Sequence, residues 1–361
     1  MVSMWIVLLK QISNMATWRQ IKTSNDDIGC RSSHGCSVWN DKLIVLGGEK
    51  VARTPVDSVI WTLSLSSDES TWTPLSTKTE AAPSPRVAHA QAISNNNNNL
   101  FVFGGRQGIT MEESPLQDLW SFSFDSSTWT LIESNELSVP PTPRSFHRMI
   151  SVGSNTLYVF GGCGAAGRLN DLYSYNIDTN IWKKLADAPA DMPGRGGPGF
   201  VANEQGDSLF VVGGFCGSES NGVWKYDILN DTWSTVLEEG NKILRPFSVA
   251  SGVTMGSTLV FFGGEVNPSE KGHEGAGGFT NDVIFLDGTT GLPITTTISS
   301  VELPTERGWM DAAAVRMESD NSGQESKSIG NNTSWTLVVF GGLSGSDEQP
   351  IRLDDVWLLK M

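Results

Sequence analysis

One motif occurs six times along this chain and restricts what it can fold into. It is an apolar run of four residues that ends in two glycines, and the first glycines stand at positions 47, 104, 161, 213, 263 and 341. A recurrence at intervals of about 50 residues indicates a repeated supersecondary unit that buries its apolar face only by stacking on its neighbours. Each run predicts a buried strand, and the glycines let the chain leave it in a conformation that side chains disfavour. The copies are LIVLGG, LFVFGG, LYVFGG, LFVVGG, LVFFGG and LVVFGG.

Two further strand-like elements follow most of the Gly-Gly pairs. Segments such as DLWSFSF and DLYSYNI alternate as strands do, and a tryptophan nine residues later marks another strand at Trp129, Trp182 and Trp233. The sixth copy stops at DDVWLLKM without room for this last strand, whereas ATWRQI near the N-terminus holds an unmatched Trp18. An N-terminal strand that completes the last blade would remove an exposed sheet edge. The sequence therefore predicts an all-β, six-bladed propeller.

The boundaries follow from the same repeat. The propeller is expected to span residues 15–361, because Met15 opens the first strand-like segment, and residues 1–14 are expected to be an extension without required structure. The polar insert at 318–334 accounts for the longest interval between repeats, and the asparagines at 95–99 suit a hairpin tip. Gly at 38 residues, Trp at 13 and only 18% charged residues also favour many short strands over amphipathic helices.

Charge and cysteine content exclude several classes of partner. A net charge of -15 repels phosphate backbones, so nucleic acid is not expected as a partner. Residues 2–9 are apolar but too short to span a bilayer, and no membrane association is expected. The cysteines form no C-x-x-C pair, which favours a reducing compartment. We expect a monomer in the cytoplasm, with the nucleus as the other option. The cysteines are Cys30, Cys36, Cys163 and Cys216.

An arginine precedes each Gly-Gly pair, and in three blades a histidine follows it at the third position. Recurrence in every blade favours a structural role, since hydrogen bonds between strands would recur with the fold. A ring of guanidinium groups near the axis could instead attract an anionic ligand. The arginines are Arg31, Arg86, Arg144, Arg195, Arg245 and Arg307, and the histidines are His34, His89 and His147.

Departures from the repeat are more informative about function. Arg106 directly follows the second Gly-Gly pair, where the other blades have no basic residue, and Arg168 stands in the Gly-rich stretch GGCGAAGR. The fifth blade carries GGEVNPSEKGHEGAG, in which Glu265 and His273 lie eight positions apart. Trp309 in RGW brings a bulky aromatic to the sixth blade. These positions are the candidates for a binding site.

The whole pattern resembles that of the kelch-repeat proteins, and the departures resemble one plant branch, the nitrile-specifier, epithiospecifier and thiocyanate-forming proteins. This resemblance implies conversion of glucosinolate aglycones, which are thiohydroximates, to nitriles or related products. It also implies an iron(II) cofactor held by an E-x-x-x-D-x-x-x-H loop, matched here by Glu265 and His273. Ser269 replaces the aspartate, and Glu270 is one position late for it. The site residues implied for an anionic substrate are Arg106, Phe146, Arg168 and Trp309.

One other function remains open from the sequence, and a further one is set aside. A non-catalytic interaction module would bind a protein through its loops, with Glu265 and His273 as loop polar residues and Arg106 paired with Glu112 or Glu113. A deep charged pocket would count against this alternative. A radical copper oxidase of the galactose oxidase type needs tyrosine ligands. The four tyrosines, Tyr158, Tyr173, Tyr175 and Tyr226, lie instead in strand positions typical of a core.

Overall fold

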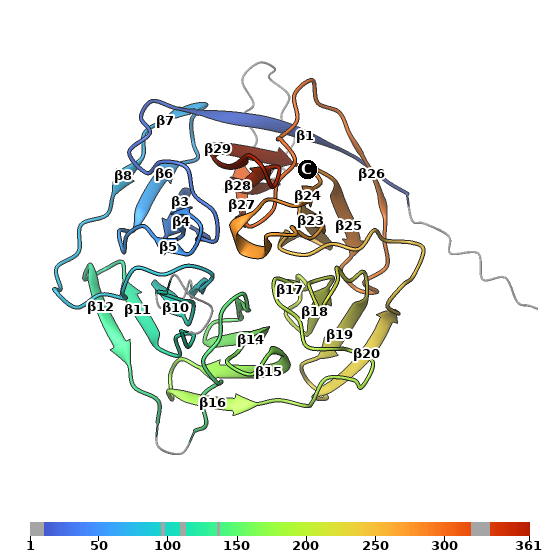
Figure 1. Cartoon of the computed structure of the whole chain (residues 1–361), viewed down its shortest axis with the longest axis horizontal. Coiled ribbons are helices and arrows are strands. Elements are labelled where there is room, and N and C mark those ends of the chain that lie inside the picture. The colour runs from blue at the N-terminus through green and yellow to red at the C-terminus, as the bar shows by residue number, and fades with distance from the viewer. Residues whose placement is uncertain (1–10, 95–97, 109–112, 136–137, 319–332) are drawn as a thin grey trace, which may run out of the picture.

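The computed structural model is a ring of six β-sheets around a central axis (Figure 1). It describes residues 11–94, 98–108, 113–135, 138–318 and 333–361. The strand that ends in Gly-Gly is second from the axis in every blade, which confirms the predicted propeller. The predicted insert at 318–334 lies almost wholly outside the described residues, as do three of the asparagines at 95–99. No helix in the described ranges is long and apolar enough to cross a membrane.

The first three blades each have four strands, ordered from the axis outward. Blade 1 is β2 (Gly35–Trp39), β3 (Lys42–Leu46), β6 (Trp61–Ser64) and β8 (Thr73–Pro74). Blade 2 is β9 (Ala90–Ser94), β10 (Asn99–Phe103), β11 (Leu119–Ser123) and β12 (Thr128–Ile132). Blade 3 is β13 (Arg148–Val152), β14 (Thr156–Cys163), β15 (Arg168–Asn176) and β16 (Ile181–Lys184).

The remaining blades follow the same order with small variations. Blade 4 is β17 (Gly199–Ala202), β18 (Ser208–Val212), β19 (Val223–Asp227) and β20 (Thr232–Leu237). Blade 5 is β21 (Ser251–Met255), β22 (Thr258–Phe262) and β25 (Val283–Asp287), and blade 6 is β27 (Asp311–Glu318), β28 (Thr333–Gly345) and β29 (Pro350–Lys360). Short pieces outside the blades are β4 (Glu49–Val51), β5 (Thr54–Pro55), β7 (Glu69–Ser70), β23 (Glu265–Asn267), β24 (Gly278–Phe279), β26 (Thr295–Ile298) and the 3-10 helix η1 (Gly272–Glu274).

The N-terminal strand β1 (Gln11–Thr23) closes the ring, as the sequence predicts. It pairs antiparallel with β29 from Thr17↔Lys360 to Ile21↔Val356 and so forms the outer strand of blade 6. The strand begins at Gln11, four residues before the expected boundary at Met15, because its first part pairs in parallel with β26. Its far end pairs in parallel with β7. One strand thus runs along the outside of blades 5, 6 and 1 (Figure 1).

The hydrophobic core lies between neighbouring blades. In several blades the outer-strand tryptophan packs against the phenylalanine that precedes the Gly-Gly pair of the blade before it. The ring centroids of Trp182 and Phe103 are 5.3 Å apart, and those of Trp72 and Phe340 are 4.9 Å apart. The four tyrosines are also buried in this core, as expected from the sequence. The same contact recurs as Trp18 with Phe262 and Trp233 with Phe160.

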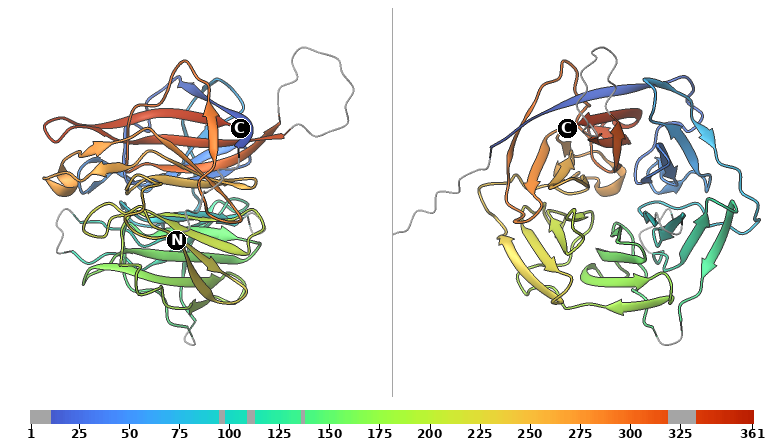
Figure 2. Two further views of the ribbon diagram at one scale, coloured as in Figure 1. Left: turned by 90° about the vertical axis from the view of Figure 1, so that its right-hand side faces the viewer. Right: turned by 180° about the vertical axis from the view of Figure 1, so that it is seen from behind.

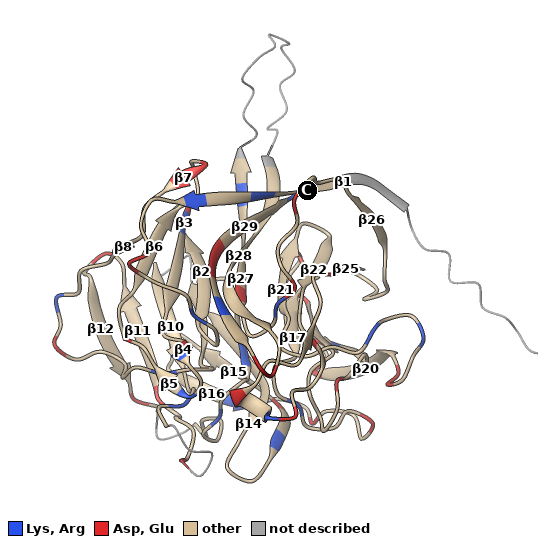
Figure 3. Cartoon of the chain, turned by 45° about the horizontal axis from the view of Figure 1, so that its top comes forward, with Lys and Arg blue, Asp and Glu red and all other residues tan. Residues whose placement is uncertain are grey.

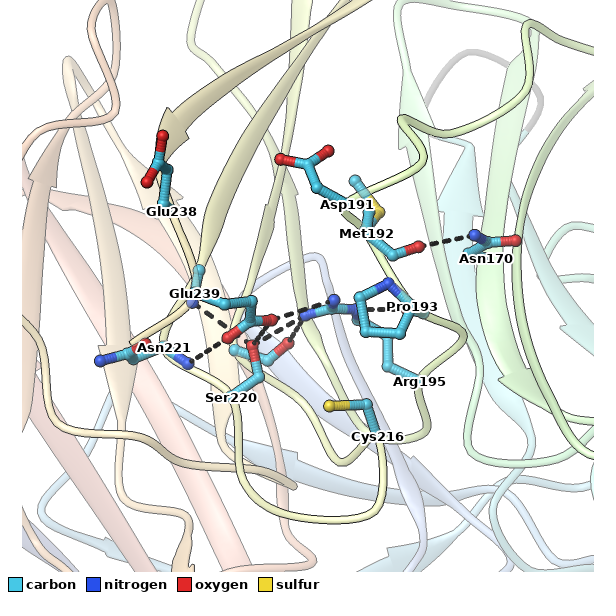
Figure 4. Close-up of polar contacts among 12 residues, drawn as sticks. Asn170, Asp191, Met192, Pro193, Arg195, Cys216, Ser220, Asn221, Glu238 and Glu239 are labelled. Carbon is cyan, nitrogen blue, oxygen red and sulfur yellow. Dashed lines mark hydrogen bonds and ion pairs between the residues drawn. The ribbon is translucent and has the colours of Figure 1, made fainter. Parts of the chain in front are cut away.

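Five of the six predicted arginines are fully buried and fasten the innermost loop of their blade. Each donates to the carbonyl oxygen of the first glycine of the pair, at 2.8 to 3.1 Å. Each also faces a carboxylate, which in blade 4 is Glu239 rather than an aspartate (Figure 4). Ser220 donates to the same carboxylate at 2.6 Å and accepts from Arg195 at 2.9 Å. The five are Arg31, Arg86, Arg144, Arg195 and Arg307.

Arg245 does not occupy the equivalent position in blade 5. Phe247 stands there, because Ser248 makes the bridge to Glu265 that in other blades follows the arginine. Phe247 is 1% exposed, whereas Arg245 is 60% exposed and pairs with Asp282 at 3.2 Å. The expectation that Arg245 is a sixth equivalent arginine is therefore wrong, because the equivalent position lies two residues later, at Phe247.

The three histidines are buried between consecutive glycine pairs. A methyl group added to Gly47 would lie 2.9 Å from the ring of His89, and one added to Gly105 would lie 2.9 Å from its Cβ. Met310 occupies the equivalent place in blade 6, between Gly263 and Gly342. Burial lowers the pKa of His34 and His89 to about 3 and that of His147 well below its usual value. These side chains are neutral parts of the scaffold.

A pH dependence of stability follows from these buried histidines. In the unfolded chain a histidine titrates near pH 6.5, so between about pH 6.5 and pH 3 the unfolded state binds more protons and the fold loses stability as pH falls. His89→Met, which copies blade 6, removes one such contribution. Between pH 7.5 and 5.5 the free energy of unfolding should fall in both proteins. We expect the fall to be about 1.4 kcal/mol smaller in the variant than in the unmodified chain. Urea unfolding at both pH values measures this difference, and parallel pH profiles would contradict it.

Candidate functional site

A closed ring of backbone hydrogen bonds surrounds the axis. In each blade the ring residue is the second one after the arginine position. Its N–H donates to the carbonyl oxygen of the equivalent residue in the preceding blade, at 2.7 to 3.0 Å. All six residues have positive φ, from 47° to 56°. This conformation is uncommon for residues with side chains and is strained for a β-branched one such as Val249. The ring residues are Ser33, Ala88, Phe146, Gly197, Val249 and Trp309.

Four of these ring residues form the floor of a cavity, and the two aromatic ones among them are predicted site residues. The ring centroids of Phe146 and Trp309 lie 5.3 Å apart, nearly perpendicular to each other. His273 packs edge-on against both, at 5.5 Å from Phe146 and 4.9 Å from Trp309. Blades 3 and 6 thus meet over the axis through an aromatic cluster, which a loop of blade 5 completes.

A second ring of side chains stands above the floor. The residue directly after each Gly-Gly pair forms an isolated bridge to the residue that follows the arginine position. Arg106 and Glu265 occupy the position after Gly-Gly in blades 2 and 5, and the sequence analysis selects both as candidates. Applying the same rule to the other blades would have found the missed residues Glu49, Cys163 and Phe215.

Four residues of each ring line a cavity of about 310 Å³. Six of the predicted residues line it together, so the structure brings them to one place. Glu270 does not line it, and the sequence analysis missed Arg53, which does. The predicted residues on the wall are Arg106, Phe146, Arg168, Glu265, His273 and Trp309.

Guanidinium groups occupy one wall of the cavity. Arg106 is held by Ser145, whose hydroxyl accepts from Nε at 2.9 Å, and by the backbone carbonyl of Glu113 at 2.9 Å. Arg168 begins β15, and its guanidinium stacks over the ring of Phe215 at 4.5 Å. Fixed positions for planar charged groups favour recognition of sulfate or carboxylate oxygens.

His273 is bound to a carboxylate that the sequence analysis did not consider. Its Nε2 lies 3.1 Å from Oε1 of Glu49, which is 1% exposed. Arg352 of blade 6 also reaches Glu49, at 3.4 Å. Burial raises the pKa of Glu49, but the hydrogen bond and charge of His273 and the charge of Arg352 outweigh it, so that the pKa is lowered overall. Glu49 therefore anchors the blade 5 loop to blades 1 and 6.

Glu265 has a different environment from the one predicted. Burial and the nearby carboxylate of Glu219 raise its pKa to about 7, although the backbone N–H groups of Ser269 and Gly277 act in the opposite direction. A carboxyl group with this pKa is partly protonated at neutral pH.

The loop between β23 and β24 is also tied to blade 6. The hydroxyl of Ser269 lies 2.5 Å from Oδ1 of Asp347, and the N–H of Glu270 donates to Oδ2 of the same residue at 3.2 Å. In the side view of Figure 2 this orange loop and the tip of the red β28–β29 hairpin lie on the same side of the ring. Ser269 and Glu270 are thus engaged by Asp347.

These contacts do not fit the iron(II) site that the resemblance implies. His273 directs a ring nitrogen at Glu49, Ser269 has a hydroxyl bonded to Asp347, and Glu270 lies away from the cavity wall. Within the ranges that the structure describes, no three His, Cys, Asp or Glu side chains are grouped so that they could hold a metal ion. In this arrangement the loop closes the cavity instead of presenting an open set of ligands.

The cavity combines a cationic wall with an apolar floor. Such a site suits a small molecule with an anionic head and an apolar tail, because a few fixed charges can orient it while aromatic surface binds the rest. Basic and acidic residues are elsewhere interspersed over the blades (Figure 3). A concentration of arginine at the axis of an acidic protein therefore marks this cavity as the candidate site.

Comparison with known proteins agrees with the geometry. The family model described as the KLHDC2/KLHL20/DRC7 Kelch-repeats domain matches residues 33–264. The chain is 28% identical over 321 residues to the N-(sulfonatooxy)prop-2-enimidothioate sulfolyase of Thlaspi arvense, covering 81% of this chain and 87% of that protein. It is also 28% identical over 245 residues to acyl-CoA-binding domain-containing protein 4 of Arabidopsis thaliana, covering 64% of this chain but only 34% of that protein. The solved structure of YjhT is similar in fold, with a TM-score of 0.64 at 16% identity over 93% of this chain and 95% of that chain.

Proposed function

The chain belongs to the Kelch-repeat family of β-propellers, and from this membership and the cavity we propose that it binds a small sulfated organic anion and directs its breakdown. The substrate class we propose is the thiohydroximate O-sulfate type, to which glucosinolate aglycones belong, with a nitrile or a related compound as product. The relative from Thlaspi arvense is named as a sulfolyase for a compound of this type.

The observation that carries the proposal is that Arg106 and Arg168 line one cavity together with Phe146 and Trp309. In this proposal the guanidinium groups hold the sulfate group as the N–O bond breaks and its electron pair leaves with sulfate, since charge-assisted hydrogen bonds strengthen as negative charge accumulates on the leaving group. For a nitrile product the C–S bond also breaks, and the sulfur atom is released as neutral sulfur, so that the thiohydroximate O-sulfate dianion gives nitrile, sulfate dianion and S⁰. The two aromatic rings pack against the organic side chain and exclude water from it. Catalysis then rests on orientation and charge stabilisation within the cavity.

Iron(II) held by Glu265, His273 and Glu270 stays a prediction from the resemblance. Binding would require His273 to leave Glu49 and Glu270 to turn toward the cavity. We therefore assign no step to the metal, and the assay below includes arms with and without added iron(II).

The test is a product assay. Allyl glucosinolate is hydrolysed by a thioglucosidase in the presence of the full chain, and gas chromatography measures the ratio of nitrile-type products to isothiocyanate. We expect the full chain to raise this ratio, and Arg106→Gln to reduce its effect by about 100-fold, the loss typical of removing one charge-stabilising donor. Lys50→Gln removes an exposed positive charge outside the cavity and serves as the matched control.

The conservative variant separates charge from geometry. Arg106→Lys keeps the charge but loses the planar donors, so we expect an effect between those of the full chain and Arg106→Gln. A full chain that leaves the product ratio unchanged, with and without iron(II), overturns the catalytic proposal. The interaction-module alternative would then be the better description of the protein.

A further inference from the structure

The short hairpin of β4 and β5 places a third arginine in the cavity. Arg53 stands between the two strands with φ of 60°, and its backbone N–H donates to Oε2 of Glu49 at 2.6 Å. Its side chain lines the cavity and is 22% exposed. Glu49 is itself buried and is held by His273 of the blade 5 loop and by Arg352 of blade 6. The backbone of Arg53 is therefore fixed by contacts to blades 5 and 6 in addition to those within blade 1.

Arg53 lies close enough to Arg106 for their charges to interact. Burial lowers the pKa of Arg106, and the positive charge of Arg53 lowers it further. The Nε of Arg53 is buried and has no hydrogen-bond partner in the described part of the chain. Among the residues that the structure describes, its ion-pair partner is Glu274 at 3.7 Å, and Glu274 is 68% exposed, so this contact contributes little.

The carboxylate of Glu49 is committed to other side chains, since Arg352 and His273 both contact it. Three guanidinium groups, those of Arg53, Arg106 and Arg168, line the same cavity. Such a set can hold two anionic groups of one ligand by charge-assisted hydrogen bonds.

We infer that Arg53 determines specificity for charge: it holds a second anionic group of the ligand beside the one held by Arg106 and Arg168, so that the cavity selects small dianions. The inference rests on the proposed function and deepens it. A thiohydroximate O-sulfate carries two such groups, the sulfate ester and the thiolate. Arg53 would face the thiolate end while the other two arginines hold the sulfate.

The test measures binding and does not depend on turnover. Isothermal titration of the full chain at low salt compares 1,2-ethanedisulfonate with ethanesulfonate, which differ by one negative group. We expect the disulfonate to bind at least about tenfold more tightly, because one additional charge-assisted contact is made. Arg53→Gln should reduce this preference to about twofold and change ethanesulfonate binding little, whereas Lys50→Gln on the same hairpin should retain the preference.

A purely structural role for Arg53 would give a different pattern. In that case Arg53→Gln would weaken the binding of both sulfonates equally. Arg53→Lys would then not restore the preference for the disulfonate, whereas a charge-selective role requires that it does. Either result overturns the inference, as does failure of the full chain to bind the disulfonate. The two proposals can also fail separately. If the protein prefers dianions through Arg53 but does not change the glucosinolate products, the binding result supports this inference and the product result contradicts only the catalytic proposal.

Discussion

Replacing Arg144 with methionine is expected to lower the free energy of unfolding by about 3 to 5 kcal/mol, the usual result of removing one partner of a buried ion pair. The guanidinium makes two parallel contacts with Asp171, at 2.7 and 3.0 Å. It also holds the carbonyl oxygens of Gly161 and Thr142, each at 3.0 Å. Methionine retains the length of the side chain but leaves a carboxylate and two carbonyl groups without these donors.

Arg245→Met is the matched control for this loss. Arg245 belongs to the same sequence series, but its ion pair with Asp282 is exposed on both sides. We expect a change below about 0.5 kcal/mol for it. Chemical denaturation of both variants at pH 7.5 measures the difference, and equal losses would show that the buried arginines do not fasten the blades.

Deleting residues 1–23 is expected to open the closed ring. The deletion removes Trp18 and Ile21, which are 8% and 1% exposed, and with them roughly 4 to 5 kcal/mol of burial free energy. It also uncovers the edge of β29, whose free backbone groups can pair with other chains. Size-exclusion chromatography with light scattering should show oligomers or aggregates for the truncated chain.

A chain that begins at Gln11 is the control for this deletion, because it keeps every pairing of β1 that the structure describes. A synthetic peptide of residues 11–23 added to the truncated chain should restore the molar mass of the full chain if the edge of β29 is the cause. A truncated chain that has the same oligomeric state as the full chain and unfolds at the same denaturant concentration would contradict the closing role of β1.

The fold could be predicted from the sequence because the repeat is written in residue types that have few alternatives. Gly47 and Gly48 have φ of 65° and 94°. An added side chain would collide with His89 of the next blade at Gly47 and with His34 of the same blade at Gly48. Trp18 indicates the closing strand because it is the outer-strand tryptophan that the sixth repeat lacks. The parallel contact of β1 with β26 carried no such signal, since backbone pairing of a polar strand end leaves no mark on residue type.

The site was predictable only where a residue departed from its repeat. Arg106 and Trp309 did so, and both line the cavity. The pairing of His273 with Glu49 joins residues 224 positions apart in different blades, a distance over which sequence spacing carries no geometric information. A substituted ligand position, Ser269, was visible in the sequence, but its contact with Asp347 was not.

The ring of hydrogen bonds at the axis also bears on how such a cavity can change. Its six positions share one backbone conformation, and the N–H and carbonyl of each are already committed to its neighbours. Four of the six, Phe146, Gly197, Val249 and Trp309, line the cavity. A side chain exchanged at one of these four positions leaves the hydrogen-bonded ring intact, so a new ligand shape can be accommodated one residue at a time without rebuilding the scaffold.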